Sequence, residues 1–167
     1  SRDKAVAEVN ASLKDDEYAD YEAGIARLKA VHDGNRKDTY LAAHLASLIF
    51  TMQLRFGPDK KMEAVAESLL GQVPVENEFA VTYAMAMSGQ KLIKNVETGS
   101  AAQTLAALQS QHPQDRELAH LAALGFLAAG DGAKAEAAYT KLAALESNSR
   151  RSRFGLIRAK YLKGDRE

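Results

Sequence analysis

Residues 116–149 read RELAHLAALGFLAAGDGAKAEAAYTKLAALESNS, two alanine-rich stretches separated by Gly130-Asp131. A second pair, Gly164-Asp165, follows 34 residues later and again comes after an apolar stretch. A 34-residue period in an alanine-rich sequence indicates stacked helix-turn-helix units, because each unit needs a neighbour to cover its apolar faces. Such proteins usually present a surface and carry out no chemistry. The spacing therefore predicts a stack of helical hairpins.

The composition of the whole chain agrees with this prediction. Of its 167 residues 46% are hydrophobic, and alanine, the best helix former, supplies much of that fraction. Helical periodicity runs throughout, and no run of alternating β-branched residues suggests a strand. We expect an all-α protein, a right-handed α-solenoid of antiparallel hairpins with roughly nine helices. The clearest pair of helices is expected at residues 118–129 and 133–145, and further helices are expected at about 37–56 and at 150–163.

Charge and cysteine content exclude several classes of protein. The formal net charge is +0, with 22 basic and 22 acidic residues, so no whole-molecule attraction to nucleic acid or anionic membranes is expected. The absence of cysteine excludes disulfides, a thiol nucleophile and cysteine zinc sites. No stretch approaches 18 consecutive apolar residues, so we expect a soluble protein without a membrane span, cytoplasmic or periplasmic. The lack of a starting methionine suggests a segment of a longer protein.

The sequence offers little that could support catalysis. The four histidines show no metal-ligand spacing, and no HExxH, glycine-rich phosphate loop or GxSxG motif occurs. Asp15-Asp16-Glu17 is expected to remain solvated and to favour the N-terminus of the next helix. We therefore expect no enzymatic activity, no cofactor, no metal and no small-molecule substrate.

The 116–149 unit resembles a tetratricopeptide repeat (TPR). The residues that carry the likeness are Ala119, Ala122, Ala123, Phe126, Ala135, Tyr139 and Leu142. Ser147 stands where the family has proline, and the family's tryptophan is absent from every unit. The preceding unit matches in its second half through Ala101, Leu105, Leu108 and Pro113, with Gly89 at the family's small position. The repeats are thus degenerate, and their style is similar to that of bacterial repeats.

The resemblance implies one repeat domain over residues 1–167. It comprises about four and a half units, at residues 2–35, 43–76, 82–115, 116–149 and a partial unit at 150–167.

In the TPR family, the first helix of each hairpin lines a concave groove that holds a peptide. Transfer of the inner positions gives a partner-binding set of Tyr83, Gln90, Lys94, Glu117, His120, Leu124, Arg151, Phe154, Arg158 and Tyr161. The second unit would add His44, Ser47, Thr51, Leu54 and Arg55. We expect Arg151 and Arg158 to be exposed, with Tyr83 and Tyr161, because a buried charge is costly. Leu124 and Phe154 could instead belong to the core.

The expected function is that of a non-catalytic scaffold that binds a peptide or partner domain in this groove. The bacterial style suggests an envelope, secretion or polysaccharide-export assembly. One alternative is an accessory or regulatory region attached to an enzyme such as a protease or a glycosyltransferase. Another is nucleic-acid contact through the basic C-terminal helix. Apolar residues on that helix could also support a homodimer, namely Phe154, Leu156, Ile157 and Tyr161.

Overall fold

The computed structural model describes residues 1–75 and 80–164, and within these ranges all regular structure is helical. The described residues form nine α-helices and one 3₁₀ turn, η1 (Leu13–Asp15). The helices are α1 (Arg2–Ser12), α2 (Tyr18–Gly34), α3 (Thr39–Phe56), α4 (Lys60–Leu70), α5 (Ala80–Ile93), α6 (Thr98–Gln111), α7 (Arg116–Ala128), α8 (Gly132–Leu145) and α9 (Arg150–Lys163). The all-α prediction is confirmed, and α3, α7, α8 and α9 lie within one or two residues of the bounds expected for them. Asp165 of the second Gly-Asp pair lies outside the described residues.

Aspartates define where several helices begin. Asp38, Asp59, Asp115 and Asp131 precede α3, α4, α7 and α8, and each carboxylate accepts a backbone N–H of the first helical turn at 2.9–3.1 Å. Such caps satisfy N–H groups that have no partner inside the helix. Gly130, which follows α7 closely, has a φ of 77°, a left-handed conformation that glycine adopts without strain.

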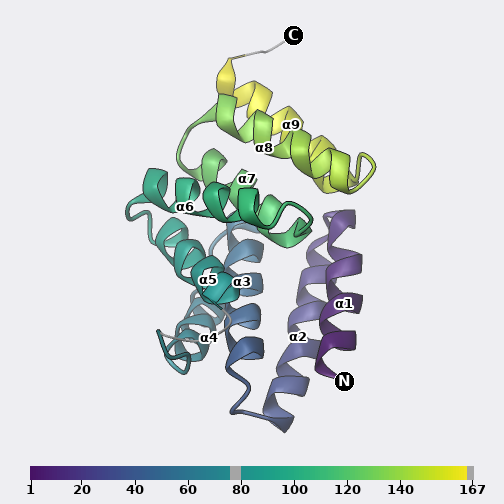
Figure 1. Cartoon of the computed structure of the whole chain (residues 1–167), viewed down its shortest axis with the longest axis vertical. Helices are drawn as coiled ribbons and strands as arrows, with labels where there is room; N and C mark the ends of the chain where they lie inside the picture. Colours follow the sequence, from purple (N-terminus) through teal and green to yellow (C-terminus); the bar gives the residue numbers. More distant parts are fainter. Residues whose placement is uncertain (76–79, 165–167) are drawn as a thin grey trace.

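The helices pack as neighbouring hairpins with a common inner layer. Each helix contacts the next along the chain, and α3, α5, α7 and α9 also contact one another in succession. Figure 1 shows α8 and α9 side by side beyond α6 and α7, while α1 and α2 stand beside α3. This arrangement is that of a stack of helical hairpins, in which the odd-numbered helices from α3 onward form one layer. The right-handed sense of a solenoid stays a prediction.

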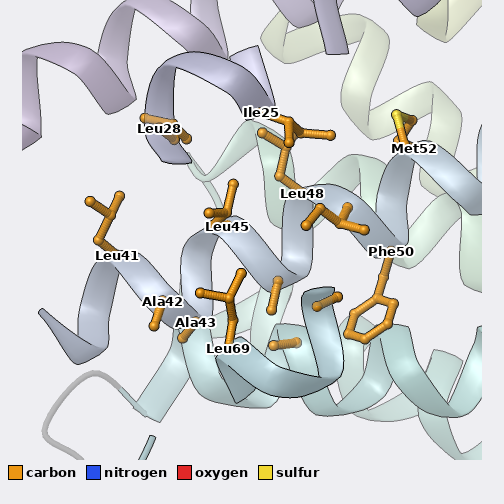
Figure 2. Packing of buried hydrophobic residues seen from close by; sticks show 14 of the residues in the cluster. Ile25, Leu28, Leu41, Ala42, Ala43, Leu45, Leu48, Phe50, Met52 and Leu69 are labelled. Carbon is orange, nitrogen blue, oxygen red and sulfur yellow. The ribbon is translucent and has the colours of Figure 1, made fainter. Parts of the chain in front are cut away.

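A nearly continuous apolar core runs along the stack. In the first half, α3 is buried on almost every side and is covered by α2 and α4 (Figure 2). Figure 2 shows Ile25 and Leu28 of α2 over Leu45 and Leu48 of α3. Two further clusters continue the core through α5–α7 and through α6–α9. Burial of these side chains is the main stabilising contribution to the fold.

Small residues allow the helices to approach closely. A Cβ atom added at Gly89 would lie 3.0 Å from the Cβ of Phe50, and one at Gly125 would lie 3.3 Å from the Cα of Ala102. The closest case is Gly155 of α9, where a Cβ would lie 2.0 Å from Cε1 of Tyr139. Both Gly89 and Gly125 are buried, and a side chain at either position would press on the neighbouring helix.

We predict that Gly155→Ala destabilises the protein, because the added methyl group overlaps the buried ring of Tyr139 and neither helix can move freely. Overpacking of this kind costs about 1–3 kcal/mol, and urea unfolding would measure it. The matched control is Gly99→Ala in α6, where no atom lies within 4 Å of the added Cβ. At that position the substitution reduces the backbone freedom of the unfolded chain, and the free energy of unfolding should rise by about 0.5 kcal/mol. Equal effects at both glycines would contradict the packing described here.

Candidate functional site

Among the described helices, α9 carries the largest group of exposed large apolar side chains, and three of them lie on its outer face. Phe154, Ile157 and Tyr161 are 38%, 64% and 64% exposed. Their spacing of three and four residues places them on one helix face. Three exposed cations, Arg150, Arg153 and Lys160, share this face. We call these six residues the α9 strip.

The α9 strip is exposed because α9 packs through its opposite face. Its buried residues are Arg151, Ser152, Gly155 and Ala159, and the last two lie against α8. The helix therefore has packing partners within the chain. It packs on α7, α8 and η1 and leaves its opposite face open.

A buried charged cluster lies behind α9 and joins it to α7. The Arg151 guanidinium donates hydrogen bonds to both oxygens of Glu117 at 2.8 and 3.2 Å. It also donates to Glu146, and its Nη1 lies 3.3 Å from Nδ1 of His120. The side chain of Arg151 is 0% exposed. We call Glu117, His120, Glu146 and Arg151 the Arg151 cluster.

The expectation that Arg151 is exposed is therefore wrong. A charge can be buried when ion pairs and hydrogen bonds offset its desolvation, and here two carboxylates surround one guanidinium. Burial works against the charge of Arg151, but Glu117 and the hydrogen bonds to both glutamates outweigh it and raise the pKa of the guanidinium. Burial, followed by the nearby charge of Arg151, lowers the pKa of His120 well below its ordinary value. His120 is therefore neutral at pH 7.

Asp16 also differs from its expected solvated state. Its backbone is left-handed, with a φ of 57°. Its carboxylate accepts hydrogen bonds from Nε and Nη2 of Arg55, each at 2.8 Å. The Asp16 side chain is fully buried, whereas that of Arg55 is partly exposed. This bidentate pair attaches η1 to the C-terminal end of α3.

A narrow recess lies between α1, α3, α5 and α7. It is lined by Asn10, His44, Ser47, Leu48, Thr51, Met85 and Glu117. The recess has room for about one water molecule and cannot hold a peptide in this conformation. Asn10 Oδ1 and His44 Nε2 are buried there without a hydrogen-bond partner within the described residues. A bound water would satisfy both atoms.

The structure separates the predicted partner-binding residues into groups. Three are buried: His120, Leu124 and Arg151. Tyr83, Gln90, Glu117 and Arg158 are half-buried, whereas Lys94, Phe154 and Tyr161 are exposed. Arg158, expected to be exposed, donates to the hydroxyl of Tyr139 at 3.3 Å. Lys94 forms an ion pair with Glu67 at 2.7 Å. It lies about 60 residues before Phe154 and Tyr161 in the sequence and on a different helix pair.

Sequence reasoning did not identify the α9 strip as a unit. Phe154 and Tyr161 were assigned to the inner groove, and Ile157 was considered only for dimerisation. The available signal was the run of positions 150, 153, 154, 157, 160 and 161, which share one face of a helix.

Comparison with known proteins identifies no relative. No family model, no curated protein and no solved structure matches this chain.

Two further searches concern metals and membranes. Within residues 1–75 and 80–164, no group of three or more histidine, aspartate or glutamate side chains is arranged to hold a metal ion. None of the described helices combines the length and the apolar character that a membrane crossing requires.

We predict that Arg151→Met strongly destabilises the fold, because it leaves the carboxylates of Glu117 and Glu146 together without their cation. Removal of one partner from a buried ion pair costs about 3–5 kcal/mol. The control is Arg153→Met, two positions along the same helix but exposed, for which a change within about 0.5 kcal/mol is expected. Urea unfolding measures both. Similar midpoints for the two variants would contradict the role of the cluster.

We predict that acidification destabilises the protein partly through His44. Burial lowers the pKa of His44 from 6.5 to about 4. Below pH 6.5 the unfolded chain therefore binds a proton that the folded chain does not, so stability is complete above pH 6.5 and falls toward pH 4. Between pH 7.5 and pH 5 the expected loss from this residue is about 1–2 kcal/mol.

Unfolding of His44→Gln at the same two pH values provides the test. The variant should lose less stability on acidification than the parent protein does. An identical pH dependence in both proteins would show that His44 does not contribute.

Proposed function

We propose that this protein is a non-enzymatic helical scaffold that binds a partner protein through the α9 strip. The observation that carries the proposal is the exposure of Phe154, Ile157 and Tyr161 on one face of a well-packed helix. A contiguous apolar face on a rigid element marks an interaction site more often than scattered apolar residues do. The likeness to TPR repeats, which bind proteins, supports the same class of function.

The charges of the strip indicate the chemistry of the partner. Arg150, Arg153 and Lys160 border the apolar residues, and no ion pair joins Arg153 or Lys160 to a carboxylate among residues that the structure describes. The complementary partner is an acidic amphipathic helix with leucine-like residues on one face. A second copy of the chain would place like charges opposite one another if it used the same face, so it fits less well.

The apolar centre of the strip also favours a protein over nucleic acid. Ile157 lies between the two aromatic side chains and is 64% exposed. Nucleic-acid surfaces combine cations with aromatic residues, but an aliphatic residue gives no base stacking or phosphate contact. Three of the positions that the resemblance assigned to an inner groove, His120, Leu124 and Arg151, are buried and do not offer a binding surface.

Fluorescence anisotropy with designed peptides tests this proposal. The probe is a labelled helical peptide with leucines at i, i+3, i+4 and i+7 and flanking glutamates, and its counterpart carries lysines in place of the glutamates. We expect the acidic peptide to bind more tightly than the basic one. Arg153→Glu/Ile157→Asp should weaken binding at least about tenfold, since central apolar and cationic contacts dominate such interfaces.

Two controls decide the interpretation. Lys61→Glu, at an exposed position of α4, should leave binding unchanged. Light scattering across a concentration range should show a monomer. A dimer that Ile157→Asp abolishes would show instead that the α9 strip binds a second copy of the chain. Equal binding of both peptides, or no effect of the double variant, would reject the proposal.

A further inference from the structure

A recess lies between α6 and α8, with α7 as its floor. Figure 1 shows these three helices as neighbours, and α7 packs on both of the others. The floor consists of Ala119, Ala122 and Phe126, which are buried, and the walls come from α6 and α8. The cavity has a volume of about 200 Å³ and opens to solvent. We call it the α7 recess.

Alanine side chains leave this space unfilled. Five of the nine described lining residues are alanines, and they come from all three helices: Ala106, Ala119, Ala122, Ala137 and Ala138. Each carries a single carbon beyond the backbone, too little to fill the space between the helices. Among the described lining residues, Phe126 alone is large and apolar, and it is 7% exposed. The recess therefore offers an apolar surface that a larger side chain could cover.

A buried amide lines the recess without a partner. Gln109 of α6 is only 8% exposed and lies in the recess wall. Among the residues that the structure describes, none forms a hydrogen bond with this amide. The amide has an acceptor oxygen and two donor hydrogens, and a buried polar group without a partner costs free energy. A peptide backbone supplies both complementary groups, one N–H and one C=O for each residue.

Two lysines border the recess on the α8 side. Lys134 Nζ lies 5.9 Å from the centre of the Phe126 ring and 3.8 Å from Asp131. Lys141 is exposed, and no carboxylate among the described residues pairs with it. The two lysines are two helical turns apart, about 10.5 Å along the axis of α8. Because α7 and α8 form a hairpin about Gly130, the lysines lie at opposite ends of the recess floor.

The size of the recess fits one side chain better than a whole metabolite. An apolar cavity of about 150 Å³ holds a benzene ring, whereas sites for small-molecule ligands usually span about 300–1,000 Å³. A recess of about 200 Å³ accommodates one leucine or phenylalanine side chain. Its border carries two cations, and the described lining contains no carboxylate, so acidic residues beside that side chain would be complementary.

We propose that the α7 recess docks one leucine or phenylalanine side chain of an acidic partner peptide. Lys134 and Lys141 receive carboxylates on either side of this anchor, and the Gln109 amide hydrogen-bonds to the peptide backbone. In an extended peptide, the residues two before and two after the anchor point to the same side and lie about 13 Å apart. Flexible lysine side chains can reach both of them. This site is formed by α6, α7 and α8, so the proposal does not rest on binding by the α9 strip.

Fluorescence anisotropy on the whole chain tests the proposal. The probe is a short labelled peptide of glycine and serine with one phenylalanine and with aspartates two residues before and after it. Replacement of the phenylalanine by alanine, or of the aspartates by lysines, should weaken binding at least about tenfold. The acid 3-phenylpropionate supplies a ring and one carboxylate without a peptide backbone, so it should compete only at much higher concentration. Equal potency of this acid and the peptide would show that the site takes a small carboxylate and would overturn the assignment to a peptide.

Two substitutions change the recess and leave the fold intact. Ala137→Leu fills the recess from an exposed position and should weaken binding at least about tenfold. Its matched control is Ala144→Leu, which is exposed on the same helix but outside the recess and should leave binding unchanged. Gln109→Met keeps the size of the side chain and removes its amide. Because no described residue bonds to that amide, stability to urea should not fall, whereas peptide affinity should fall about threefold or more.

A variant of the α9 strip separates this site from the one proposed above. Arg153→Glu/Ile157→Asp should leave binding of the phenylalanine peptide unchanged, whereas Lys134→Glu/Lys141→Glu should weaken it at least about tenfold. If the α9 variant weakens binding and the lysine variant does not, the peptide binds the α9 strip and the recess proposal is wrong. Failure of the peptide to bind the parent protein, or full binding by Ala137→Leu, would also reject it.

Discussion

Close approach of helix backbones at small residues is the constraint on which the structure depends. Where α9 passes α8, Gly155 leaves room for the ring of Tyr139, and Gly132 lies against the last turn of α9. The distance between two packed helices depends on the side chains at their contact. These glycines therefore determine where α9 lies, and so whether it can reach η1 and Glu17.

The helices and their order could be predicted from the sequence because their signals are local. Periodicity, the glycines after helices and the alanine-rich composition all act within one or two turns. The close approach at Gly89 could be predicted for the same reason, since a small residue on an apolar face indicates a tight contact. Aspartate caps such as Asp115 were equally visible but were not used.

The openness of the groove could not be predicted in this way. It depends on how helices far apart in the sequence pack on one another, and no local pattern carries that information. The burial of Arg151 depends on Glu117, which lies 34 residues earlier, and on Glu146 in the preceding turn. The first interval is one repeat length, so a search for opposite charges at equivalent positions of successive units could have found the pair.

The Arg151 cluster restricts how this sequence can change over generations. Glu117 and Glu146 share one buried guanidinium, so loss of Arg151 leaves two carboxylates without a cation, and loss of either glutamate leaves Arg151 with a single carboxylate. A lineage that replaced them singly would pass through poorly folded intermediates. Related chains should therefore carry all three residues or have apolar residues at all three positions. This joint pattern would identify common ancestry, which similarity of the alanine-rich surroundings would not.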